Sequence, residues 1–413
     1  MTSPPTTGIR HAPRDERTEG LRGFAALMVV YTHMLTPFPH VDPGYSVSPW
    51  FWNIEVSQGA VLLFFVLSGY VIGMTNHTAF NASTVASYAR RRALRLVPLY
   101  LLAVAISVAA CPTDSAAAVV GNLLFLQNAL PYGSWHFPLL TANPNLWSLN
   151  YEVLYYMLFV LVWATRRRWP FWLAGAAVLG AVGWRLPYGG MLLATYAAGW
   201  TFWLSGYGLA QARQEDANEA AHRLPWPSLL LLWVATWHLK PMWWFAHRFG
   251  LLPDESWMNY SFYDFIPGCV ALIMVTSGRR PRGYRLIAWA TLVLPVAFLL
   301  WQMIRGRLFG TAFNFNDGLC LLALALWWWR PSPNLFARLA PVGAISYAVY
   351  IFHSPLQQLV ILQSWLPSGN VATFVLRCIL ILALTATVAW LGEQRLQPWL
   401  RNRFLPPRAR PGA

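Results

Sequence analysis

Apolar runs of membrane-spanning length recur along the chain, and short polar or basic segments separate them. The runs are continuous rather than alternating, so the pattern predicts helices and disfavours a transmembrane β-barrel. If the shorter apolar stretch at 116–130 were a full span, the basic segments would no longer all lie on the same side of the membrane. We therefore expect this stretch to be re-entrant or interfacial. The sequence predicts an all-α polytopic membrane protein, a bundle of about 10–12 transmembrane helices. The candidate spans fall near 22–40, 58–76, 96–111, 145–165, 170–187, 190–211, 226–240, 260–278, 285–304, 315–329, 341–365 and 371–392.

The composition agrees with a membrane protein. Of the 413 residues, 57% are hydrophobic and 11% are charged, which leaves too little polar surface for a soluble domain. The net charge of +15 could suggest a nucleic-acid partner, but the basic residues gather between the apolar runs, as the positive-inside rule describes. We therefore predict a lipid bilayer as the surroundings and no nucleic acid. The basic segments are 90–95, 166–168, 278–285 and 393–403.

The ends of the chain differ from its middle. Residues 1–16 are polar and proline-rich, which is typical of a disordered tail, and residues 398–413 form a basic, proline-rich tail. Residues 17–397 would form the transmembrane domain. The positive-inside rule places both tails in the cytoplasm. The four cysteines lie in apolar surroundings without paired spacing, so we expect free thiols rather than disulfides or a zinc site.

The first apolar run carries Arg22 near its start and His33 inside it. Eleven residues make about three helical turns, so both side chains would project from nearly one face, about 16 Å apart. An arginine at the cytoplasmic interface suits a phosphate group, and a histidine away from bulk water suits proton transfer. On spacing alone, Arg22 also fits a positive-inside anchor and His33 a packing residue.

Other polar residues interrupt the apolar runs. Ser68 and Gly69 lie within one span, where small residues usually permit close helix contact. Arg92 and Arg95 are three residues apart and so share a helix face, which fits either lipid headgroups or a polyphosphate. Glu152 lies in an apolar, aromatic run and needs a partner there. A later span carries the polar residues Tyr347, Tyr350 and His353.

Together these residues resemble the acyltransferase-3 family of integral membrane enzymes, which O-acylate surface polysaccharides, lipopolysaccharide, peptidoglycan and some antibiotics. The matches cover residues 18–160 and 343–356. The region 165–340 carries no matched motif, and we expect it to determine which acceptor the enzyme uses. After Glu152, Val153 and Leu154 stand where the family commonly has polar residues. Five motifs occur in family order: R-x10-H from Arg22 to His33; FFxLSG from Phe64 to Gly69; RxxR at Arg92 and Arg95, before Pro98; WSLxxExxxY at Trp147, Ser148, Leu149, Glu152 and Tyr156; and SYxxYxxH at Ser346, Tyr347, Tyr350 and His353.

The resemblance implies a stand-alone O-acyltransferase of a bacterial inner membrane, without a soluble esterase-like extension. Acyl-CoA, most often acetyl-CoA, would be the co-substrate, with no tightly bound cofactor. Arg22, Arg92 and Arg95 would bind its phosphates, and His33 would act as general base or accept the acyl group, with Glu152 as its partner. The acceptor would be a hydroxyl of a cell-envelope glycan or a small molecule. We expect Ser68, Trp147, Ser148, Tyr347, Tyr350 and His353 either to line the acceptor side or to support the bundle.

Two other functions fit parts of the sequence. A transporter would use the intramembrane charges as a substrate path, although no internal repeat is visible. A non-catalytic scaffold of an export system would need the arginines but not His33. No HxxxH or HxxE spacing occurs in a span, so a metal is not indicated.

Overall fold

The computed structural model describes residues 15–35, 41–128, 137–165, 168–187, 190–214, 223–250, 263–309 and 314–405, and in these ranges it contains helices and no β-strand. The helices confirm the predicted all-α class. Their bounds are α1 Glu16–Leu35, α2 Ser57–Thr75, α3 Ala82–Ala110, α4 Ala116–Leu123, α5 Trp147–Thr165, α6 Trp169–Val182, α7 Gly190–Gln211, α8 Trp226–Leu239, α9 Pro241–Arg248, α11 Ile266–Ser277, α12 Tyr284–Ile304, α13 Asn314–Ala325, α14 Asn334–Ala337, α15 Ala340–Gly343, α16 Ser346–Ile361, α17 Val371–Leu391 and α18 Gln397–Phe404.

Every predicted span contains a helix in its described part. By length and composition, five helical segments of the described chain can cross a membrane: α2, α3, Pro144–Thr165, α12 and Val371–Phe404. The stretch 116–130 contributes only the eight-residue helix α4, so its described part does not form a full span. Of the predicted tails 1–16 and 398–413, residues 1–14 and 406–413 lie outside the described residues. Glu16 begins α1, and residues 398–404 belong to α18, so this part of the second tail is helical.

Two helices begin earlier than the apolar pattern indicates. Helix α1 begins at Glu16 rather than near 22, because Asp15 accepts hydrogen bonds from Thr18 Oγ1 at 2.6 Å and Arg17 N at 3.3 Å. Helix α3 begins at Ala82 rather than near 96, with a capping box between Asn81 and Thr84. A hydropathy pattern detects the apolar part of a helix and misses a polar first half.

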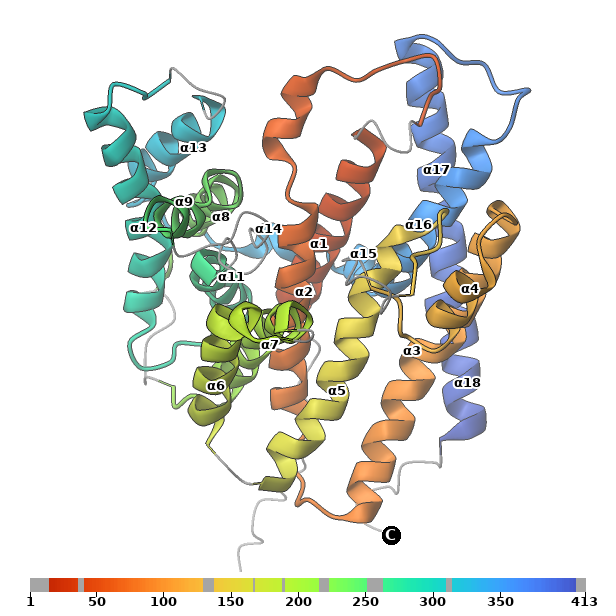
Figure 1. Ribbon diagram of the computed structural model, residues 1–413, viewed down its shortest axis with the longest axis horizontal. Helices are drawn as coiled ribbons and strands as arrows, with labels where there is room; N and C mark the ends of the chain where they lie inside the picture. Colours follow the sequence, from red (N-terminus) through yellow and green to blue (C-terminus); the bar gives the residue numbers. More distant parts are fainter. Residues whose placement is uncertain are drawn as a thin grey trace, which may run out of the picture.

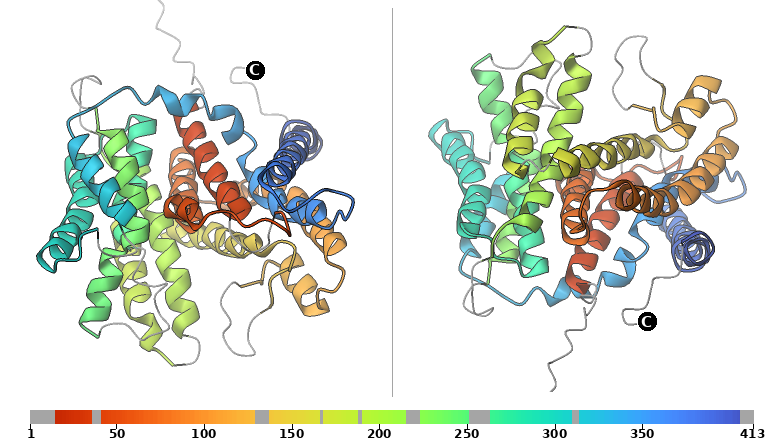
Figure 2. Two further views of the ribbon diagram at one scale, coloured as in Figure 1. Left: turned by 90° about the horizontal axis from the view of Figure 1, so that it is seen from above. Right: turned by 90° about the horizontal axis from the view of Figure 1, so that it is seen from below.

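Helix α1 lies near the middle of the molecule. Viewed along the bundle, it lies between a group containing α6 to α13 and a group containing α3, α4, α16 and α17 (Figure 2). The start of α3, the end of α5 and the end of α18 lie at the same end of the bundle (Figure 1). The basic segment 90–95 lies in the first half of α3 and 393–403 runs into α18, so these two segments lie towards the same side, as expected for a membrane protein.

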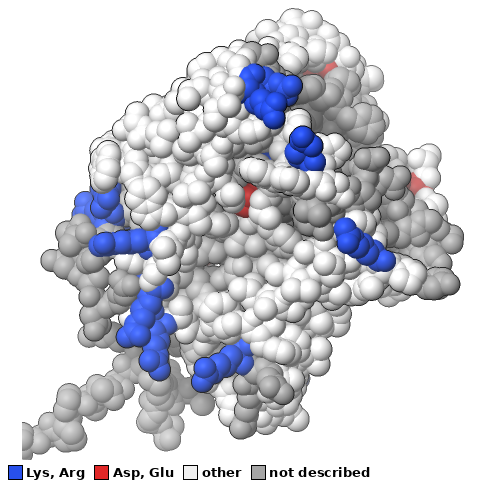
Figure 3. Space-filling model, turned by 60° about the vertical axis from the view of Figure 1, so that its left-hand side comes forward, with Lys and Arg blue, Asp and Glu red and all other residues white. Residues whose placement is uncertain are grey.

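The surface agrees with lipid surroundings. One face of the molecule is largely uncharged, with a few separated Lys and Arg side chains (Figure 3). Large apolar side chains are exposed on α12 and α17, among them Leu286, Val293, Ile379 and Leu382. In water such a surface would be unfavourable, whereas in a bilayer it contacts hydrocarbon.

Glycines allow α2 and α7 to pack closely. A Cβ atom on Gly69 would lie 1.9 Å from the carbonyl oxygen of Trp203, and one on Gly206 would lie 1.8 Å from that of Val66. Neither distance is possible, so these positions require glycine. The close contact confirms the small-residue interpretation of Gly69 and fixes the face of α2 that carries Ser68.

Candidate active site

A cavity of about 130 Å³ lies between α1, α2, α3, α5 and α16. At about 30 Å³ for each water molecule, it would hold about four. Its charged lining residues are Arg22, Arg92, Arg95 and Glu152, and each was predicted from the sequence as a site residue. Four of the other predicted residues line it as well: Ser68, Ser148, Tyr347 and Tyr350.

The start of α1 directs Arg22 into this cavity. Gly20 and Gly23 pack against the backbone of Phe336 and Leu339, so closely that a Cβ atom on either glycine would overlap a carbonyl oxygen. This packing holds one face of α1 against α14 and α15 and leaves Arg22 on another face, where its Nη1 lies 3.3 Å from Glu19 Oε1. Arg22 lies six residues after the first residue of α1, so it is about 9 Å along the helix rather than at its first turn.

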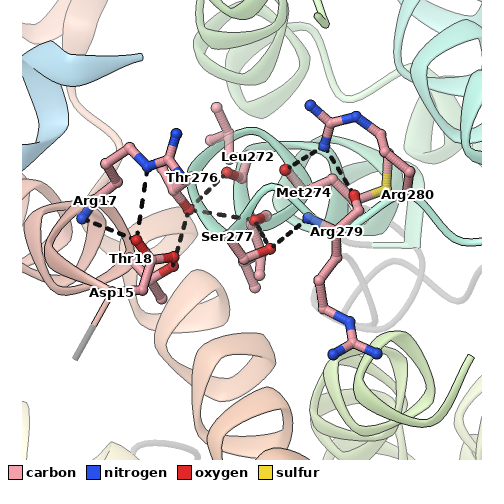
Figure 4. Close-up of polar contacts among 10 residues, drawn as sticks. Asp15, Arg17, Thr18, Leu272, Met274, Thr276, Ser277, Arg279 and Arg280 are labelled. Atoms are coloured by element: carbon pink, nitrogen blue, oxygen red, sulfur yellow. Dashed lines mark hydrogen bonds and ion pairs between the residues drawn. The ribbon is translucent and has the colours of Figure 1, made fainter. Parts of the chain in front are cut away.

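A second polar cluster anchors the same end of α1 to the end of α11 (Figure 4). The hydroxyl groups of Thr18 and Thr276 lie 3.5 Å apart. Arg280 Nη1 donates to the carbonyl oxygen of Met274 at 2.7 Å, and the Arg279 N–H donates to Ser277 Oγ at 3.4 Å. The two arginine contacts satisfy polar groups at the end of α11, and the threonine contact joins this end to α1.

The other two arginines come from the middle of α3. The Arg92 guanidinium lies over the rings of Tyr156 and Tyr88, at 5.2 and 5.6 Å from their centroids. Arg95 interacts electrostatically with Glu393, which lies in the π-helical turn Gly392–Leu396 after α17. Glu393 was not among the predicted site residues, although it stands out as the one acidic residue in the basic segment 393–403.

Glu152 contacts Tyr156 and Ser68 rather than His33. The Tyr156 hydroxyl donates to Glu152 Oε1 in a short hydrogen bond, and the Ser68 hydroxyl lies 3.5 Å from the same oxygen. The expectation that Glu152 pairs with His33 is therefore wrong in this structure. Tyr156 follows Glu152 by one helical turn, so the contact forms within α5 and needs no second helix.

His33 pairs instead with His353, and the sequence did not predict this contact. His33 Nδ1 and His353 Nε2 lie 2.8 Å apart, which joins the end of α1 to α16. His353 is 1% exposed and His33 is partly exposed. Asn145 Nδ2 lies 3.2 Å from His353 Nε2 and 2.5 Å from Ser354 Oγ. Gln357 Nε2 donates to the carbonyl oxygen of His33 at 3.0 Å.

A proline explains how Asn145 reaches His353. Pro355 lies inside α16 and has no N–H, so the carbonyl group of Ile351 lacks its helical donor. Asn143 Nδ2 supplies that hydrogen bond at 2.8 Å. The contact holds the segment before α5 against α16, and Asn145, two residues later, then meets the histidine.

Tyr350 and Ser148 lie between the cavity and the histidine pair. Both line the cavity, and their hydroxyl oxygens are 2.7 Å apart. The Tyr350 hydroxyl also donates to the carbonyl oxygen of Asn145 at 2.9 Å, and its ring centroid is 6.2 Å from that of His353. Trp147 does not line the cavity and packs edge-on against Tyr151. The site thus has a charged cavity and, beyond Tyr350, a pair of imidazoles.

Comparison with known proteins identifies the family of the chain. The acyltransferase-3 family model, described as an acyltransferase domain, matches residues 16–287. Nodulation protein 10 of Rhizobium leguminosarum bv. viciae is 24% identical over 422 residues, which cover 89% of this chain and 94% of that protein. No solved structure matches. The family match covers most of the chain, so this protein belongs to the acyltransferase-3 family and is a membrane O-acyltransferase.

Proposed function

We propose that the protein transfers an acyl group, an acetyl group by preference, from cytosolic acyl-CoA to a hydroxyl of a cell-envelope glycan or a related acceptor. The observation that carries the proposal is the cavity lined by three arginines next to the paired histidines. The basic ends of the helices would face the cytosol of a bacterial cell, and the enzyme would lie in the inner membrane with both termini cytoplasmic.

The arginines would bind the phosphates of the donor. Guanidinium groups bind phosphate oxygens through two parallel hydrogen bonds, and Arg92 and Arg95 lie on one face of α3. Arg22 faces the same cavity from α1. Glu152 is the carboxylate of the cavity lining and would accept a hydrogen bond from an amide N–H of the pantetheine arm.

The acyl end would then extend along α1 towards His33. Arg22 and His33 are about 16 Å apart along the helix axis, a distance that the extended pantetheine arm can cover. In direct transfer, the acceptor hydroxyl gives its proton to His33, its oxygen bonds to the thioester carbon, and the C–S bond breaks. The CoA thiolate leaves and takes the proton from the imidazolium. General base catalysis of this kind contributes about 10²- to 10⁴-fold in rate.

Donor binding provides the first test. Acetyl-CoA would be titrated against the purified protein in nanodiscs, with Arg92→Ala/Arg95→Ala compared with Arg90→Ala/Arg91→Ala. Both double variants remove two charges from α3, but Arg90 and Arg91 are exposed and do not line the cavity. We expect Kd to rise about 100-fold in the first variant, because charge-assisted hydrogen bonds contribute about 1.5–3 kcal/mol each.

Three outcomes would contradict the proposal. Equal losses in both variants would mean that binding depends on net charge and not on this cavity. No binding of acetyl-CoA or longer acyl-CoAs by folded protein would overturn the donor assignment. Turnover through an isolable acylated His33 would replace direct transfer with a two-step reaction.

A further inference from the structure

The hydrogen bonds of His353 determine which nitrogen of His33 carries a proton. His353 Nδ1 lies 3.1 Å from the carbonyl oxygen of Val349, four residues earlier in α16. A carbonyl oxygen only accepts, so Nδ1 of His353 must be the protonated nitrogen. In a neutral imidazole the other nitrogen, Nε2, then carries the lone pair and accepts.

Two donors meet that lone pair. The Asn145 amide nitrogen, which can only donate, lies 3.2 Å from His353 Nε2. His33 Nδ1 lies 2.8 Å from the same atom, so it too must donate and therefore carries a proton. The remaining nitrogen of a neutral His33, Nε2, is left with the lone pair. The tautomer of one ring thus fixes the tautomer of the other.

The geometry of the two rings fits this hydrogen bond. The ring planes differ by 4° and the centroids are 5.1 Å apart. With nitrogens only 2.8 Å apart, such rings lie edge to edge in one plane, as a linear N–H···N contact requires. His353 is buried and His33 is partly exposed, so the ring with the available lone pair is also the more exposed of the two.

We propose that His353 is a positioning residue, which holds His33 as the Nδ1–H tautomer and presents its Nε2 as the general base. In catalytic triads a carboxylate performs this task, whereas here a neutral imidazole does so, itself oriented by the Val349 carbonyl and Asn145. When Nε2 takes the acceptor's proton, the Nδ1–H bond to His353 stays in place and stabilises the imidazolium. The catalytic consequence rests on the proposed function, but the tautomer assignment does not.

The test combines nitrogen NMR with kinetics. Protein labelled with ¹⁵N-histidine would be recorded as wild type, His353→Leu, His353→Gln and the control His77→Leu, with the His33 signals assigned from His33→Ala. Leucine removes the acceptor. Glutamine places an amide oxygen close to the position of Nε2 and can still accept from His33 Nδ1. His77 lies in an exposed turn after α2 and contacts the Met74 carbonyl oxygen.

We expect His33 to be the Nδ1–H tautomer in wild type, His353→Gln and His77→Leu, and a mixture of tautomers in His353→Leu. With acetyl-CoA and methyl glucoside as a surrogate acceptor, kcat should fall about 100-fold in His353→Leu with KM for acetyl-CoA unchanged, and His353→Gln should restore most of it. A rise in KM with kcat unchanged would indicate a purely structural role and overturn the proposal.

The spectra decide the tautomer even without turnover. If His33 is the Nε2–H tautomer in wild type, or keeps its tautomer in His353→Leu, the proposal is wrong whatever the kinetics. If wild type binds no acyl-CoA and transfers nothing while the spectra match the expectation, the proposed function fails and the positioning of His33 stands. If His353→Leu does not fold, His353→Gln compared with wild type still decides, because loss of the Nδ1–H tautomer there would contradict the assignment.

Discussion

The two halves of α1 hold their polar side chains in opposite kinds of surroundings. Arg22 faces a cavity that contains three guanidinium groups and a carboxylate, and Glu19 lies within 3.3 Å of it. His33, near the other end of the helix, contacts the imidazole of His353, and Tyr350, which lines the cavity, lies next to that ring. A cluster of charges can bind and orient a charged ligand, whereas a base must carry a free lone pair. Under the proposed function, this difference would separate donor binding from proton transfer along one helix.

Removing His33 should have the largest effect on turnover. His33→Ala deletes the proposed base and leaves the cavity lining unchanged, so acyl transfer should fall by about 10²- to 10⁴-fold. The acetyl-CoA Kd should stay within about twofold, since no arginine is altered. Parallel measurement of transfer rate and binding in nanodiscs checks both. A variant that loses binding and turnover together would show that the two halves of α1 do not act separately.

A change in the packing between α2 and α7 should have the second largest effect, and it should act on the half of the site that contains the cavity. Gly206→Ala places a methyl group on the Val66 carbonyl oxygen, and we expect a loss of about 3 kcal/mol in stability. Because α2 carries Ser68 and Phe64 into the cavity, acetyl-CoA binding should weaken as well. The matched control is Gly175→Ala on α6, where a Cβ atom meets nothing within 4 Å. Thermal unfolding in detergent should show a lower Tm for Gly206→Ala alone.

The geometry of Arg22, and not only its charge, should matter. Arg22→Lys keeps the charge but removes the planar pair of donors, so we expect acetyl-CoA to bind about tenfold more weakly. Arg17→Lys provides the control, because Arg17 lies on the same helix outside the cavity lining. The ¹⁵N signals of His33 should be unchanged in both variants. Equal affinity for acetyl-CoA in Arg22→Lys and wild type would mean that Arg22 contributes its positive charge alone and not its planar pair of donors.

The sequence predicted which residues form the site better than it predicted which residues touch. Arg22, Arg92 and Arg95 share one cavity, as expected of a common binding group, whereas Glu152 lies in that cavity and not beside His33. Their partners were not predictable, because contacts between helices depend on how each helix is rotated about its axis. That rotation comes from packing, such as Gly20 against the Phe336 carbonyl group, which no spacing rule encodes.

The residues that position His353 were missed for a related reason. Asn145 lies in a short 3₁₀ segment before α5, and its contact depends on the carbonyl group that Pro355 leaves free on another helix. Each residue has an ordinary role within its own segment, and only the fold joins them. A proline within an apolar span is the signal that sequence reasoning could have used, since it requires a donor from elsewhere.

The smallest expected effect concerns the loop that follows α1. Asp42 is 1% exposed, and although burial alone would raise its pKa, hydrogen bonds from Thr373 Oγ1 and the N–H groups of Gly44 and Gly369 lower it. A lowered pKa means that the folded state favours the carboxylate, so this stabilisation is complete above the ordinary aspartate pKa of about 3.9 and is lost as the pH falls below it.

Asp42→Asn should therefore cost about 1 kcal/mol at neutral pH and remove the corresponding loss of stability in acid. Tm measured between pH 3 and pH 7 would show the two proteins converging as Asp42 protonates. The contacts of Asp42 hold the start of α17 and leave the arginine cavity unchanged, so acetyl-CoA affinity at neutral pH should not change. Tm curves that stay parallel through acid would mean that Asp42 contributes through its shape and not its charge.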